Sequence, residues 1–175
     1  MYTDFLLTEF LGNKLQDYLW LLAAIMIGLL FKKLISRYFS RLLFKIVGKK
    51  DSSVGVDRFD ELLTKPIGLC VMLSIIFLGA SHIQYPSEWG LVSEDELGLK
   101  MFISKGFALL YVFSVFWILL KLIDYVGLIL HKRAEETESK MDDQLIPFII
   151  EIAKILTYLF AIFIIMGNVF DVNVT

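Results

Sequence analysis

The chain has 175 residues, of which 57% are hydrophobic and 21% are charged, and its net charge is −2. Intrinsic disorder is excluded, because disordered chains have low hydrophobicity and high net charge. A mean hydropathy of +0.70 argues against an ordinary soluble domain, since one small core cannot bury so much apolar surface. The composition predicts an integral membrane protein with room for about four to six helical spans.

Four apolar stretches are expected to cross the membrane, at about residues 15–34, 66–85, 106–130 and 144–175. The second is uncharged from Pro66 to Ser87, which meets the requirement of about 20 apolar residues. The third and fourth carry charged residues near one end. The first is uncharged only over residues 18–31, so a buried helix of a soluble domain is its alternative on length alone.

The predicted fold is therefore all-α, a multi-pass transmembrane helical bundle of four spans. Residues 1–143 hold the first three spans and a basic cytoplasmic segment at residues 32–50, and residues 144–175 hold the last span. The single cysteine, Cys70, provides neither a disulfide framework nor a cysteine metal cluster.

The distribution of basic residues predicts the orientation of these spans. Residues 32–50 contain seven Lys or Arg and no acidic residue, which places this segment in the cytoplasm. The loop at residues 81–98 has no Lys or Arg and fits the outside, whereas the loop at residues 131–143 has three and fits the inside. Four alternating spans then leave the N-terminus and the C-terminus both outside.

The basic segment repeats a cation every four residues, at Lys33, Arg37, Arg41, Lys45 and Lys49. This spacing is close to the helical period, so these residues are expected to form one stripe, here called the basic stripe. The stripe predicts either an amphipathic helix on the inner membrane surface or a continuation of the first span. Its cations are candidate contacts for anionic lipid headgroups, and a simple topological anchor is the alternative.

The approach to the second span is expected to be short and polar, over residues 57–65, with Pro66 at the start of the helix. Near the third and fourth spans, Lys121 and Asp124 are three residues apart, as are Glu151 and Lys154. Each pair is expected to share a helix face and to form a local ion pair near the cytoplasmic interface. An ion or proton path is the less favoured interpretation. Glu151 and Lys154 join the basic stripe as candidate lipid and interface contacts.

Sequence signatures of catalysis are missing. His82 and His131 are predicted on opposite sides of the membrane, and the chain has no phosphate-binding glycine loop, HExxH or GxSxG motif. The acidic runs at residues 94–96 and 142–143 are interpreted as solvated surface. We therefore expect no enzyme activity, cofactor, metal site or nucleic-acid partner, and we expect membrane lipids as partners.

The last span is bracketed by short motifs. It opens with D-D-Q-L-I-P at residues 142–147, contains I-A-K-I-L at residues 152–156, and the chain closes with N-V-T at residues 173–175. In order and spacing these motifs resemble the small-conductance mechanosensitive ion channel family, over about residues 138–175. The earlier residues are similar to that family only in kind, as extra N-terminal spans.

The resemblance implies that the last span is the helix that precedes the pore-lining helix. It implies a lipid-facing sensor portion of a channel that opens under membrane tension, in the inner membrane of a bacterium, within a homo-heptamer formed by the full-length protein. The Gly- and Ala-rich pore helix of the family would begin just after Thr175, so we expect a truncation before the pore and no pore-lining residue in this chain. The alternative is a complete four-span accessory or assembly protein without channel activity.

Overall fold

The computed structural model describes residues 8–10, 12–47, 55–80, 83, 98–135 and 140–170. A small antiparallel hairpin, β1 (Glu9–Phe10) and β2 (Asn13–Lys14), precedes the helices. Gly12 occupies its turn with a φ of 79°, a left-handed conformation that glycine adopts without strain. Four long helices follow, α2 (Leu15–Val47), α3 (Val56–Ala80), α4 (Leu99–Glu135) and α5 (Lys140–Ile164), and α5 continues into a π-helical turn, η2 (Ile165–Val169).

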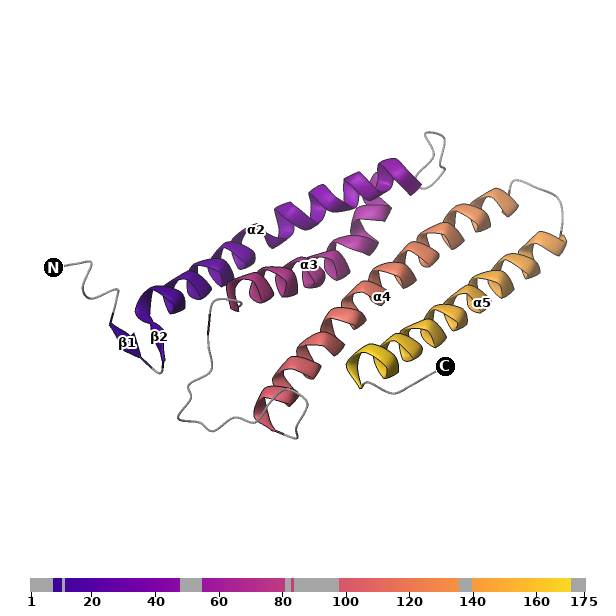
Figure 1. Cartoon of the computed structure of the whole chain (residues 1–175). Coiled ribbons are helices and arrows are strands. Elements are labelled where there is room, and N and C mark those ends of the chain that lie inside the picture. Colours follow the sequence, from indigo (N-terminus) through magenta and orange to yellow (C-terminus); the bar gives the residue numbers. More distant parts are fainter. Residues whose placement is uncertain are drawn as a thin grey trace.

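The helices run up and down in sequence order (Figure 1), with α2 packed on α3, α3 on α4, and α4 on α5. All four are long and apolar enough to cross a membrane. The expectation of an all-α chain with four spanning helices is therefore confirmed, apart from the small hairpin that the sequence did not predict. The orientation of the spans relative to the two sides of the membrane stays a prediction.

Helix α2 is continuous through most of the basic stripe. Its 33 residues extend about 50 Å at 1.5 Å per residue, well beyond a hydrocarbon core of about 30 Å. Of the two expectations for the stripe, the structure therefore shows the continuation of the first span. The stripe residues Lys33, Arg37, Arg41 and Lys45 are exposed on α2, and Lys49 lies outside the described residues.

The expected start of the second span at Pro66 is wrong, because α3 begins at Val56 and contains Pro66 in its interior. A proline inside a helix removes one backbone hydrogen bond. Here the helix continues because Phe59 and Leu63, which precede the proline, are both fully buried against neighbouring helices. The same helix ends at Ala80, before the predicted residue 85. Similarly, α4 is longer at both ends than the predicted 106–130.

A compact aromatic cluster joins three helices. The ring of Phe59 on α3 lies 4.7 Å from that of Tyr125 on α4 and 5.3 Å from that of Phe44 on α2, centroid to centroid. Leu63 and Ile67 complete the buried part of this core. Edge-to-face rings at these distances stabilise one another beyond the effect of burial.

Two glycines allow α2 and α3 to approach closely. A Cβ atom at Gly79 would lie 3.0 Å from Cβ of Ala24, and one at Gly28 would lie 3.1 Å from Sδ of Met72. Helices in lipid associate through such close contacts between small residues, because lipid supplies no hydrophobic driving force between them. The α2–α3 pair therefore packs tightly along its apolar length.

Candidate functional site

Each helix carries one uncharged stretch that ends in a lysine. These stretches are residues 18–31, 66–80, 106–120 and 155–170, and the lysines at their ends are Lys32, Lys65, Lys121 and Lys154. Contacts between neighbouring helices align these ends, since Ser40 meets Asp60, Phe59 meets Tyr125, and Asp124 meets Lys154. The four lysines therefore belong to one level of the molecule, here called the charged band.

The charged band marks one boundary of the apolar part of the protein. Stretches of 14 to 16 residues correspond to about 21 to 24 Å along a helix, against about 30 Å for a typical hydrocarbon core. Lysine side chains bridge part of that difference by extending their ammonium groups toward water. The aromatic core residues Phe44, Phe59 and Tyr125 lie beyond the band, on the side away from the uncharged stretches.

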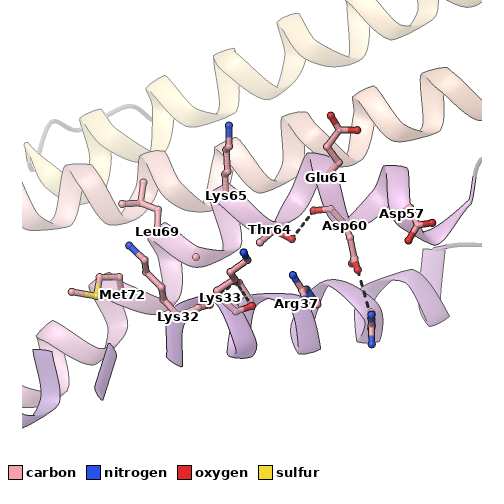
Figure 2. Close-up of a pocket in the computed structure, with 13 residues that line it drawn as sticks. Lys32, Lys33, Arg37, Asp57, Asp60, Glu61, Thr64, Lys65, Leu69 and Met72 are labelled. Atoms are coloured by element: carbon pink, nitrogen blue, oxygen red, sulfur yellow. Dashed lines mark hydrogen bonds and ion pairs between the residues drawn. The ribbon is translucent and has the colours of Figure 1, made fainter. Parts of the chain in front are cut away.

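A groove of about 850 Å³ opens between α2 and α3 at the charged band. Figure 2 shows its lining in sequence along the two helices: Leu69 and Met72 at one end, then Lys32, Lys33 and Lys65, then Arg37, and acidic residues at the other end. Three residues of the basic stripe, Lys33, Arg37 and Arg41, therefore line this groove. Lys45 does not.

The acidic end of the groove is largely neutralised by its neighbours. One carboxylate oxygen of Asp60 accepts a hydrogen bond of 2.6 Å from the buried Ser40 hydroxyl, and the other lies 3.5 Å from Nε of Arg41. Arg58 forms an ion pair with Glu61 on the same helix. Asp60 thus links α3 to α2.

A second charged cluster joins α4 to α5. Nζ of Lys121 lies 2.8 Å from one carboxylate oxygen of Asp124, and Nζ of Lys154 lies 2.5 Å from the other. The expected pair of Lys121 and Asp124 is confirmed. The expected pair of Glu151 and Lys154 is wrong, because Lys154 reaches across to α4 and Glu151 has no ion-pair partner among the described residues.

The sequence pointed to some of these residues and missed others. Lys32 and Lys65 were not singled out, although each is the last charge before an uncharged stretch and could have been found by that signal. Ser40 and Asp60 are twenty residues apart, and nothing local in the sequence predicts their contact.

The described residues offer little for metal or nucleophilic chemistry. No group of three or more His, Cys, Asp and Glu side chains within them could hold a metal ion. Cys70 is half-buried in α3 and His131 is exposed on α4, whereas His82, the acidic run at residues 94–96 and the side chains at 142–143 lie outside the described part. The charged groups that are described can bind ions or lipid headgroups and can hold helices together.

The four helices and the charged band define the chain as a multi-pass membrane protein. Comparison with protein-family models, with curated proteins and with solved structures finds no match. A more specific function therefore rests on the residues themselves.

The predicted orientation is tested by labelling. In a Cys70→Ala background, we expect a cysteine at Ser87 to react with a membrane-impermeant maleimide on intact cells. A cysteine at Ser53 should react only after lysis, because the basic segment around it is held in the cytoplasm. The opposite pattern of labelling would reverse the orientation of all four helices.

Proposed function

We propose that this chain is the lipid-facing sensor portion of a mechanosensitive ion channel. The observation that carries the proposal is the exposure of apolar side chains along every helix, most fully on α5. In the most apolar window of residues 145–169 no residue is buried. Helices with so much contact with lipid must move with the bilayer. The motifs that bracket residues 140–175 support this class of channel rather than another.

The mechanism is a population shift between two states. A closed and an open state that occupy different areas of membrane respond to tension, which favours the larger one. The charged band holds the helices at the membrane interface, since moving its lysines into hydrocarbon is costly. The candidate lipid contacts Lys33, Arg37, Arg41, Lys45, Lys49, Glu151 and Lys154 belong to this anchoring. The homo-heptamer implied by the resemblance is part of the proposal.

The end of α5 offers a place for bending. The helix changes to π-type hydrogen bonding over Ile165–Val169, and the N–H of Phe170 donates to the carbonyl of Ile165 at 3.2 Å. Single π-helical turns occur often at functional sites and at bends in helices. A bend here would let α5 change its tilt without movement of the charged cluster at its other end.

Patch recordings test the proposal. We expect the full gene product, expressed in giant spheroplasts that lack their own mechanosensitive channels, to give stepwise currents whose open probability rises with suction. Voltage alone, and suction on spheroplasts without the gene, should give none. Absent or tension-independent currents would contradict the proposal and would favour a four-span accessory or assembly protein.

A further inference from the structure

We propose that the groove between α2 and α3 binds the phosphate of an anionic phospholipid from the leaflet that meets the charged band. The proposal rests on the membrane-spanning helices and not on channel activity. It therefore stands or falls separately from tension gating.

The first argument is an excess of unpaired positive charge. Lys32, Lys33 and Arg37 project from α2, and Lys65 contributes a fourth cation from α3. None of the four has an ion-pair partner among the residues that the structure describes. Several lysine and arginine side chains on two helices form a suitable site for a phosphate group, because each adds charge-assisted hydrogen bonds.

The acidic residues of the groove do not cancel this charge. Asp60 is already held by Ser40 and Arg41, and Glu61 by Arg58. Asp57, at the far end of the groove in Figure 2, is the remaining carboxylate of the lining. Four unpaired cations against one carboxylate favour an anion over a zwitterion or a cation.

The second argument is the apolar end of the groove, which favours a lipid over a soluble phosphate. Leu69 and Met72 lie about one and two turns beyond Lys65, toward the uncharged stretch of α3. Gly68 leaves space between them and α2, since a Cβ there would still lie 3.7 Å from the nearest atom, Oγ of Ser36. The groove thus has a cationic part for a headgroup phosphate and an apolar part for the start of an acyl chain.

The position in the membrane agrees with this occupant. The cations sit at the charged band, where headgroups of the adjoining leaflet lie, and the groove is open rather than enclosed along α2 and α3 (Figure 2). Anionic lipids attract basic residues at the interface by about fivefold in binding per residue. Cations arranged in one groove are expected to exceed the diffuse attraction of the same number spread over the surface.

The experiment measures the association of spin-labelled phosphatidylglycerol and phosphatidylcholine with the full-length protein in phosphatidylcholine vesicles. We expect the wild-type protein to prefer phosphatidylglycerol, and the double variant Lys33→Gln with Arg37→Gln to lose about 25-fold in that association. The matched control is Lys45→Gln with Arg133→Gln, which removes the same charge from exposed sites outside the groove. Its loss should stay below about threefold.

Two further arms distinguish the sources of the phosphate and the effect of folding. Excess inorganic phosphate should not displace the lipid, and displacement would overturn the lipid assignment in favour of a soluble anion. The charge-conserving variant Lys33→Arg with Arg37→Lys should keep most of the binding. Equal losses in the groove and control variants, or no preference of the wild type for phosphatidylglycerol, would overturn the site. Circular dichroism verifies that each variant retains its helices.

Discussion

Replacing Phe59 with alanine should lower the free energy of unfolding by about 3 to 5 kcal/mol, the usual cost of removing a fully buried aromatic ring. Phe59 has no exposed surface and touches the rings of Phe44 and Tyr125. It lies beyond the charged band, where water rather than hydrocarbon surrounds the helices. Burial there is stabilised by the hydrophobic effect, which is missing between helices inside lipid. Unfolding in mixed micelles by increasing SDS, followed by circular dichroism, measures the change.

The matched control is Phe160→Ala on α5. Phe160 is 62% exposed, so lipid or detergent fills the space that its ring leaves. We expect a change within about 0.5 kcal/mol. Equal effects at the two positions would show that the aromatic cluster is not a core of the folded protein.

Replacing Asp124 with leucine should cost about 1 to 3 kcal/mol and should loosen α5 from α4. The carboxylate holds Lys121 and Lys154 together, and its loss leaves two like charges side by side. Removing one member of a fully buried ion pair costs about 3 to 5 kcal/mol, and an exposed pair contributes at most about 1 kcal/mol. These side chains are 25% to 35% exposed, which places the effect between the two limits. The same SDS titration measures it.

Two comparisons make the Asp124 result specific. The triple variant with Lys121→Met and Lys154→Met should recover most of the lost stability, because apolar side chains of similar length replace an ion cluster at little cost. Glu151→Leu removes a carboxylate from the same region of α5 that has no ion-pair partner among the described residues, and we expect it to change little. If Asp124→Leu is as mild as Glu151→Leu, the cluster does not join the two helices.

The same contacts bear on tension sensing. The aromatic cluster and the Asp124 cluster both lie at or beyond the charged band, and together they link α2, α3, α4 and α5 at that level. The uncharged stretches carry the exposed apolar surface. Under the proposed function, this places the linked ends at one interface and leaves the lipid-facing lengths to respond to the bilayer.

Sequence patterns were most informative where the physical cause is local. Hydropathy over about 20 residues and the absence of charge located all four spans, because transfer into lipid depends on the side chains of each segment itself. The pair of Lys121 and Asp124 was predicted for the same reason, since residues three apart on a helix are neighbours whatever surrounds them. The expected helix start at Pro66 was wrong because its local signal was outweighed by the burial of Phe59 and Leu63 against other helices.

By itself, the sequence determined that this is a four-helix membrane chain and where each apolar stretch ends. Only the tertiary structure decided that the basic stripe continues α2, that Lys154 pairs with Asp124 rather than Glu151, and that Lys32 and Lys65 meet across one groove. The physical reason is that composition and helical period follow from the order of residues, whereas partners on different helices depend on which faces pack together. Residues such as Ser40 and Asp60, twenty positions apart, become neighbours only through that packing.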